Sequence, residues 1–470
     1  MSLELRVPSF ASFARDVWAP LSACSLRHTV RGFFLLSLVP LLAGSAAAQG
    51  PQYRATSGPF ALTECRIETV ANGTVERGTV VIQGTDIVAV GPNAAVPAGA
   101  TRVPCDGATV YPGFIDGGTR LGLVEIGSVR ETQDLDEIGG VVPQMRALTA
   151  VNPSSVSIPV TRVSGVLAAL SVPQGGLMPG TAGLIRLHGY TPDQMAVGFE
   201  GVVLRFPMTG RRGRWDRRSK EAIEKAAKEQ LEALNEVWTE AVAYARIDSA
   251  RTAQRSTEPM PYNPELAALL PVLRGERALL VEVNTAADIL AAIEWLDETA
   301  GDRVRAVLTG VAEGWRVADN IAEARLPVVT GPVTGRPTRG GDRYDRAYTN
   351  AALLAGAGVE LALRTEDTEN VRNLPFHAGF AVAYGRELGF DRADALRAIT
   401  LAPARIFGVA DRLGSIEVGK EATLFIVNGD PFEPRSEVRE TFVAGQRVPV
   451  VSRHTELNDE YLNRSPGLAR

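Results

Sequence analysis

The chain has 470 residues, of which 45% are hydrophobic and 22% charged, the balance of an ordinary globular protein. Its formal net charge of −5 provides no basic surface, so we expect no nucleic-acid partner. The length is too great for one small domain and is compatible with an α/β barrel that carries a further unit.

The N-terminal segment has the features of a secretory signal. His28 and Arg31 precede an apolar run over 32–44, and small residues follow, with Ala46 and Ala48 in the A-x-A arrangement. The run is shorter than the ~20 residues that a membrane-spanning helix needs. We predict cleavage at about Ala48 and a periplasmic or secreted chain with no stable membrane span. An uncleaved anchor is the alternative, and the long region before the basic residues leaves the true translation start open.

Cleavage would remove Cys24 and leave Cys65 and Cys105, each in a strand-like segment of the same N-terminal unit. Exported proteins fold in an oxidising space, where an even number of cysteines usually pairs. We therefore predict a disulfide between Cys65 and Cys105, with two buried free thiols as the alternative.

Short strand-like segments separated by turn signals stand at both ends of the predicted mature chain. The N-terminal ones are too few to bury a good core alone. Near the C-terminus, a turn and two strands over 413–427 and a hairpin over 438–448 offer a partner for them. The N-terminal strands are predicted at 61–67, 78–83, 86–90 and 108–111.

Between these ends, predicted strands alternate with predicted helices, which indicates a parallel sheet. The strands are predicted at 277–282, 304–308, 327–329 and 359–363, and the helices at 285–299, 313–324, 349–357, 391–400 and 403–407. A long helical run over 219–251 interrupts the pattern and follows an arginine-rich segment, 211–218. We interpret the two as a solvated loop and an amphipathic helix packed on the barrel, the alternative being a lid or partner surface with an anion-binding cluster.

The stretch from Pro112 to Asp116 reads Pro-Gly-Phe-Ile-Asp and resembles the first barrel strand of the amidohydrolase superfamily, close to its imidazolonepropionase-like members. The pattern there is PGxID, a small residue, and two histidines that hold a catalytic metal; this chain has Gly118 and Arg120 in their places. Residues 413–427 resemble the GS-x-x-x-GK-x-AD segment of the same superfamily, with Thr423 replacing the aspartate.

The resemblance covers nearly all of residues 60–450 and implies an α/β fold. It implies a distorted (β/α)8 TIM-type barrel with a small composite β-sandwich built from both ends of the chain. The domain boundaries that we predict are 1–48 for the signal peptide, 49–110 and 409–452 for the two parts of the sandwich, 111–408 for the barrel with a helical insertion at about 211–255, and 453–470 for a tail.

Superfamily members hydrolyse non-peptide C–N bonds with zinc or a similar divalent metal, held by histidines and by a glutamate or carboxylated lysine. Glycine has no ligand atom, and arginine has no lone pair to give. The remaining histidines, His188, His377 and His454, match no family ligand position, and none of the four lysines lies on a predicted barrel strand. We therefore predict no bound metal and no cofactor.

Carboxylates at predicted strand ends remain as candidates for a site. Three of them could hold a hard cation, or they could pair with arginines as a metal-free polar cluster, which is the interpretation we favour. The candidate catalytic residues are Asp116, Glu366 and Asp367, and the candidate cavity-lining residues are Gly118, Arg120, Glu282 and Arg364.

Two hypotheses follow for function. The first is a metal-free, non-catalytic periplasmic homologue, a pseudoenzyme, that binds a small molecule at the barrel mouth or associates with an active relative. The alternative is an active hydrolase of cyclic amide or dipeptide-like C–N bonds with a non-standard carboxylate site. A homodimer is a family expectation, and whether the chain is an enzyme stays open at this point.

Overall fold

The computed structural model describes residues 54–210, 216–253 and 261–464. The predicted signal segment, its cleavage site at Ala48 and the first part of the arginine-rich segment lie outside those residues. Within the described ranges, no helix has both the length and the apolar character needed to cross a membrane.

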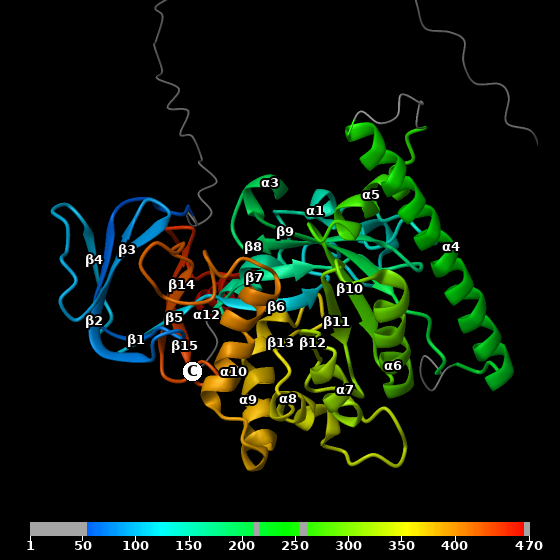
Figure 1. Cartoon of the computed structure of the whole chain (residues 1–470). Coiled ribbons are helices and arrows are strands. Elements are labelled where there is room, and N and C mark those ends of the chain that lie inside the picture. The colour runs from blue at the N-terminus through cyan, green and yellow to red at the C-terminus, as the bar shows by residue number, and fades with distance from the viewer. Residues whose placement is uncertain (1–53, 211–215, 254–260, 465–470) are drawn as a thin grey trace, which may run out of the picture. The chain divides into compact units, whose positions relative to one another are not determined.

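Eight strands form a nearly closed barrel (Figure 1). Neighbouring strands are parallel except that β8 runs antiparallel to both β7 and β9. The barrel closes where the Glu366 N–H donates to the Gly118 carbonyl and the Arg120 N–H donates to the Asp367 carbonyl, each at 3.0 Å. The strands, in their order around the barrel, are β13 (Leu361–Leu363), β12 (Val328–Thr330), β11 (Ala306–Gly310), β10 (Ala278–Val283), β9 (Ala196–Arg205), β8 (Gly180–Arg186), β7 (Val166–Ser171) and β6 (Phe114–Thr119).

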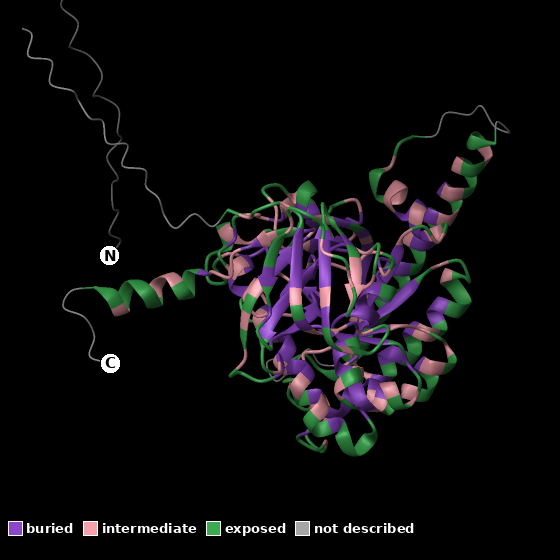
Figure 2. Cartoon of the chain, turned by 90° about the vertical axis from the view of Figure 1, so that its left-hand side faces the viewer, coloured by how far each residue is buried: buried purple, intermediate pink, exposed green. Residues whose placement is uncertain are grey.

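Alternation along each strand divides its side chains between two apolar cores. Leu280 on β10 and Val307 on β11 belong to the core inside the barrel, which helix α11 (Leu401–Ile406) and the residues after it also join. Leu279 and Leu308, each adjacent in sequence to one of these residues, belong to the core beneath the outer helices. Figure 2 shows the strands as the most buried part of the chain. Burial on both faces explains the continuous apolar runs in the sequence.

The predicted helices are present, with shifted ends. Thr285 caps α6 as predicted by accepting from the Asp288 N–H at 3.2 Å, but the last turn of the predicted helix is a π-turn, η2 (Leu296–Ala300). The remaining helices are α1 (Ala147–Ala150), α2 (Ser157–Arg162), α3 (Pro192–Met195), α5 (Pro264–Leu273), α6 (Ala286–Trp295), α7 (Ala318–Glu323), α8 (Arg346–Gly356), α9 (Leu374–Gly385), α10 (Arg392–Ala398) and α12 (Arg453–Asn463), with 3-10 turns η1 (Arg130–Thr132), η3 (Gly314–Arg316), η4 (Val371–Asn373) and η5 (Arg386–Leu388).

The inserted helix α4 (Lys220–Thr252) is amphipathic, as predicted. Its buried face includes Leu234 and Trp238, and the Trp238 ring packs edge to face on Trp295 of α6 at 5.1 Å. Its outer face carries three Lys–Glu pairs at i,i+4 spacing. Such a helix is stabilised mainly by burial of its apolar face, since exposed pairs contribute little.

Strands from both ends of the chain together form a second sheet of eight strands. This sheet has an apolar core separate from those of the barrel. C-terminal β14 pairs antiparallel with N-terminal β5, which joins the two halves. Cys65 and Cys105 are linked by a disulfide. The sheet contains β16 (Gln446–Val448), β15 (Glu437–Val443), β14 (Leu424–Asn428), β5 (Thr109–Pro112), β1 (Phe60–Glu68), β2 (Thr74–Gln83) and β3 (Asp86–Gly91) in that order, with β4 (Thr101–Pro104), which was not predicted, beside β1.

A buried ion cluster ties this composite sheet to the base of the barrel, the end where the parallel strands begin. Arg186 is the last residue of β8 and lies at the base because this strand runs antiparallel to its neighbours. Its guanidinium binds Glu421 of the C-terminal segment, with Nη2 and Oε2 2.6 Å apart. Arg412 contacts the same carboxylate at 2.8 Å. Burial acts to raise the pKa of Glu421, but these guanidiniums outweigh it and hold the pKa below its usual value.

Candidate functional site

The mouth of the barrel, where its parallel strands end, contains neighbouring cavities, which are the usual place for a site in this architecture. One of about 30 Å³, called the inner cavity here, lies at the end of β6. A second of about 200 Å³, the outer cavity, lies beyond it. Glu366 lines both. The inner cavity is also lined by Gly118, Arg120, Glu282, Thr309 and Arg364, and the outer one by Asn284, Trp315, Pro332, Arg336, Arg346 and Asn350.

Asp116 is fully buried and lines neither cavity. Its carboxylate accepts from the Gly118 N–H at 3.0 Å and from the Thr365 hydroxyl at 2.6 Å and N–H at 3.2 Å. Burial raises the pKa of Asp116 to about 7, although the hydrogen bonds from Thr365 and the positive charge of Arg364 act to lower it. Asp116 therefore joins β6 to the segment after β13 and helps to close the barrel.

Gly118 and Arg120, in the places of the expected histidines, both lie against the segment that follows β13. A Cβ atom at position 118 would lie 3.3 Å from Cδ of Arg364, so a larger residue at 118 would need the Arg364 side chain to shift. Arg120 donates from Nη2 to the Glu366 carbonyl at 3.0 Å, while its Nε is buried without a hydrogen-bond partner. Two guanidinium groups thus lie at the end of β6, beside the positions at which the resemblance implies histidines.

Arg364 and Glu366 form an ion pair of 3.0 Å at the wall of the inner cavity. The Arg364 side chain is 6% exposed, and its Nε is also buried without a partner. Glu366 has a φ of 57°, which is uncommon for a residue other than glycine, and its side chain is 40% exposed. The exposed carboxylate therefore faces the shared wall of the two cavities.

Asp367, the neighbouring candidate, has a different role. Its carboxylate accepts from the N–H groups of Thr368, Glu369 and Asn370 at 2.6, 3.0 and 3.1 Å. Burial acts to raise the pKa of Asp367, but these hydrogen bonds outweigh it and hold the pKa below its usual value. It holds the turn after β13 and lines neither cavity.

Glu282 at the end of β10 faces the inner cavity and pairs with Arg205 at 3.1 Å. Arg205 was missed by sequence reasoning, because its place beside Glu282 depends on the register of the parallel strands β9 and β10, which only the structure shows. The structure therefore brings Gly118, Arg120, Glu282, Arg364 and Glu366 to one cavity and leaves Asp116 and Asp367 outside it.

The donor set at the mouth does not fit the divalent metal of the superfamily. In the described ranges, no group of three or more His, Cys, Asp or Glu side chains is arranged to hold a metal ion. The two carboxylates of the inner cavity are each paired with a guanidinium. One oxygen of each is held by a guanidinium, and the positive charges of these arginines and of Arg120 disfavour a divalent cation beside them.

The three remaining histidines lie elsewhere. His188 follows β8 at the barrel base and contacts Gln446 Oε1 at 2.9 Å. His377 in α9 is 7% exposed, and burial lowers its pKa to about 4 despite the opposing charge of Asp367. His454 lies in α12. None lines the inner or the outer cavity.

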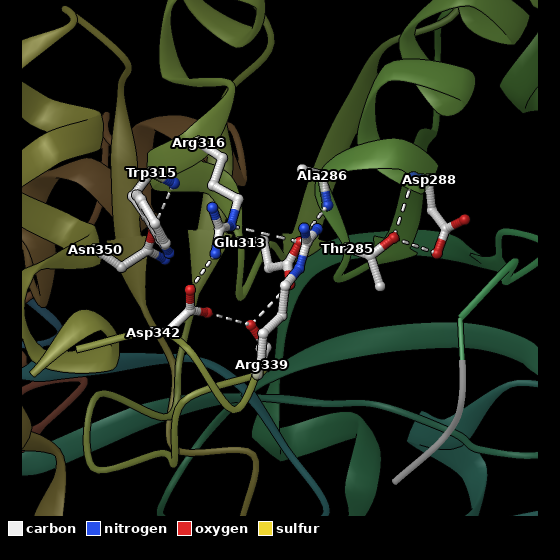
Figure 3. Close-up of polar contacts among 10 residues, drawn as sticks. Thr285, Ala286, Asp288, Glu313, Trp315, Arg316, Arg339, Asp342 and Asn350 are labelled. Atoms are coloured by element: carbon white, nitrogen blue, oxygen red, sulfur yellow. Dashed lines mark hydrogen bonds and ion pairs between the residues drawn. The ribbon is translucent and has the colours of Figure 1, made fainter. Parts of the chain in front are cut away.

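A second polar network, which sequence reasoning missed, holds the loop that borders the outer cavity (Figure 3). The Glu313 side chain is 2% exposed and accepts from the Ala286 N–H at the start of α6 at 3.0 Å. From the loop after β12 it accepts the Thr338 hydroxyl at 2.8 Å and Arg339 Nε at 2.7 Å. Glu313 therefore pins this loop to the mouth, and no local pattern signals a contact across so many residues.

Trp315 forms part of the outer cavity wall, and its position is fixed from two sides. The backbone N–H of Trp315 donates to Asn350 Oδ1 at 2.8 Å, and the Asn350 side-chain amide donates to the Val311 carbonyl at 2.9 Å. The guanidiniums of Arg316 and Arg346 lie over the indole, 4.0 and 4.5 Å from its centroid. The wall therefore combines an aromatic face with positive charge.

Comparisons with known proteins agree with this architecture. The model of the amidohydrolase family matches residues 345–451. An amidohydrolase from Thermotoga maritima MSB8 is similar in structure, with a TM-score of 0.71, 24% identity, and coverage of 84% of this chain and 100% of that chain. An uncharacterized protein has a TM-score of 0.50 with 18% identity, covering 83% of this chain and 99% of that chain.

No curated protein matches the chain. At these identities the likeness to solved structures establishes the fold, and the family model supplies the family for the C-terminal part of the barrel and its sheet. The family match is confined to residues 345–451, and the fold of the chain as a whole is similar to that of the Thermotoga amidohydrolase.

Proposed function

We propose that this protein is a metal-free amidohydrolase homologue that binds a small molecule at the barrel mouth without hydrolysing it. The observation that carries the proposal is the replacement of metal-ligand positions by packed guanidiniums. Arg364 fills the space in front of Gly118, and Arg120 crosses to the Glu366 carbonyl. Cationic groups at both places repel a divalent ion instead of binding it.

The chemistry of guanidinium supports a binding role over hydrolysis. A metal lowers the pKa of bound water to about 7 by direct coordination, whereas a guanidinium only donates hydrogen bonds. It can orient an oxygen atom and stabilise negative charge, but it does not generate hydroxide. Binding without turnover is therefore the role that Arg120 and Arg364 suit.

The carboxylate-based hydrolase is less well supported by the contacts. A general base must reach the substrate or its water. Asp116 is fully buried and accepts from three donors at the barrel closure, the Gly118 N–H and the N–H and hydroxyl of Thr365, and Asp367 caps a turn. Glu366 faces the cavities, but its carboxylate is bound to Arg364 at 3.0 Å.

A periplasmic or extracellular location is part of the proposal. It is supported by the basic residues, short apolar run and A-x-A site of the N-terminal segment. The disulfide between Cys65 and Cys105 is also of the kind that persists in an oxidising compartment. Cell fractionation with N-terminal sequencing tests it, with a mature start near Gln49 expected and a cytoplasmic, uncleaved chain contradicting it.

Elemental analysis of the mature protein by plasma mass spectrometry tests the central claim. We expect less than about a tenth of an equivalent of zinc after incubation with excess zinc and removal of free ion. A panel of cyclic amides and dipeptides should show no turnover. Stoichiometric metal together with turnover would overturn the proposal, as would metal-free turnover that Glu366→Gln abolishes in a folded protein.

A further inference from the structure

We infer that the inner cavity is an anion subsite for the carboxylate of a small organic acid, whose body lies in the outer cavity. Arg120 and Arg364 are the donors in this arrangement. The inference rests on the proposed binding function and specifies the chemical class of its ligand.

Unused donors are the first observation. Nε of Arg120 and Nε of Arg364 are both buried without a hydrogen-bond partner, and both residues line the inner cavity. Buried polar groups in proteins are nearly always paired, so two orphaned donors beside one cavity need an explanation. An oxyanion in the cavity would lie beside both guanidiniums, which bind carboxylate oxygens strongly, and a small turn of either side chain would give its covered Nε an acceptor.

The charge balance of the inner cavity also favours an anion of single charge. Arg205 neutralises Glu282, and Arg364 neutralises Glu366. Arg120 forms no ion pair within the described ranges and donates only to a carbonyl oxygen. One positive charge therefore remains, which suits a monocarboxylate better than a dianion.

The sizes of the two cavities set the shape of the ligand. The inner cavity, about 30 Å³, is large enough for a group the size of one or two waters and so for a carboxylate head. The outer cavity, about 200 Å³, has Trp315, Pro332 and Ala351 in its wall. Because Glu366 lines both cavities, a head group in one and an apolar or aromatic body in the other can belong to one molecule.

Further positive charge surrounds the proposed body. Arg336 and Arg346 line the outer cavity and form no ion pair within the part of the chain that the structure describes. Arg346 lies over the Trp315 ring at 4.5 Å. These groups raise the local concentration of anions at the entrance and draw an acid toward the inner cavity.

Glu366 competes with the proposed ligand. Its carboxylate holds Arg364 Nη2 at 3.0 Å and adds a negative charge beside the anion subsite. Replacing it by glutamine removes that charge and leaves Arg364 free for the ligand. Glu366→Gln should therefore bind carboxylates more tightly than the natural protein. If the Arg364–Glu366 ion pair were only structural, the substitution would not strengthen binding.

Isothermal titration calorimetry of the full mature chain with sodium benzoate, in a low-chloride buffer, tests the subsite. We expect benzoate to bind and its neutral analogue benzamide to bind at least tenfold more weakly. Arg120→Gln should weaken benzoate binding at least tenfold, and Arg120→Lys should restore part of it. Glu366→Gln should strengthen it severalfold.

Matched controls separate the subsite from general charge effects. Arg77→Gln removes an exposed arginine of the composite sheet and should leave benzoate affinity unchanged. Arg364→Lys provides a second test at the buried donor, with circular dichroism to verify folding. Equal binding of benzoate and benzamide, unchanged affinity in Arg120→Gln, or binding of inorganic phosphate but not benzoate would overturn the inference.

The outcome is distinguishable from failure of the proposed function. Metal-dependent turnover would overturn the non-catalytic role. The change in benzoate affinity caused by Arg120→Gln would still test the anion subsite separately. A metal-free, inert protein that binds no carboxylate would sustain the non-catalytic role and overturn the anion subsite.

Discussion

The base and the mouth of the barrel use the same residue types in different ways. At the base, Glu421 is shared by Arg186 and Arg412 at 2.6 and 2.8 Å, and the cluster joins the barrel to the composite sheet. At the mouth, Arg120 and Arg364 each keep a buried Nε without a partner. A saturated cluster is a structural joint, whereas an unsaturated one retains binding capacity for a molecule that is not part of the chain.

The largest effect is expected from breaking the joint at the base. Glu421→Ala leaves the buried guanidinium of Arg186 without its counterion, which should lower the free energy of unfolding by about 3–5 kcal/mol. Urea denaturation measures it. Glu76→Gln, which removes a highly exposed partner of Arg66, is the matched control and should have no measurable effect. A small loss for Glu421→Ala would contradict the assignment of the base cluster as a joint.

Stability should also depend on pH through Asp116 at the closure of the mouth. Burial raises its pKa in the folded state to about 7 from an ordinary 3.8, so between these values the folded protein retains a proton that the unfolded chain has released. The associated stabilisation is complete below the ordinary pKa and is lost as the pH rises through 7.

Relative to Asp116→Asn, the natural protein should therefore lose about 2.3 kcal/mol of unfolding free energy between pH 5 and pH 7. Urea titrations of both proteins at several pH values measure the difference. Parallel pH profiles for the two proteins would show that Asp116 does not titrate in this window.

A smaller effect is expected at the loop that borders the outer cavity. Glu313→Gln keeps the shape of the side chain but removes the charge that holds Arg339 and Thr338. Loss of a charge-assisted hydrogen bond should lower the unfolding free energy by about 2 kcal/mol and speed amide exchange in the loop. Hydrogen exchange measured by mass spectrometry would detect it, and unchanged protection of residues 333–345 would contradict the pinning role.

The smallest change in stability is expected for Arg120→Gln. The variant loses the hydrogen bond to the Glu366 carbonyl, which destabilises the fold, but it also removes a buried unpaired Nε, which stabilises it. The net change in unfolding free energy should therefore be within about 1 kcal/mol. Comparison with Glu421→Ala in the same denaturation assay sharpens the contrast between mouth and base. A loss as large as that of Glu421→Ala would mean that Arg120 is a structural residue.

Much of the fold was predictable because its signals are local. Apolar runs marked β10 and β11, Thr285 marked the start of α6, and the Gly-rich turns marked the hairpins of the composite sheet. The antiparallel direction of β8 was not predictable, since a strand buried on both faces has the same apolar pattern in either direction. β4 was missed because four residues carry little periodicity.

The candidate site was only partly predictable, because the identity of a side chain and its direction have different origins. The sequence by itself determined which donor atoms exist: Gly118 and Arg120 bring no imidazole to the first barrel strand, wherever that strand lies. Only the tertiary structure decided which carboxylates face the cavity. Asp116 turns toward Thr365, a residue 249 positions away in the chain, because closing the barrel places the two strand ends side by side.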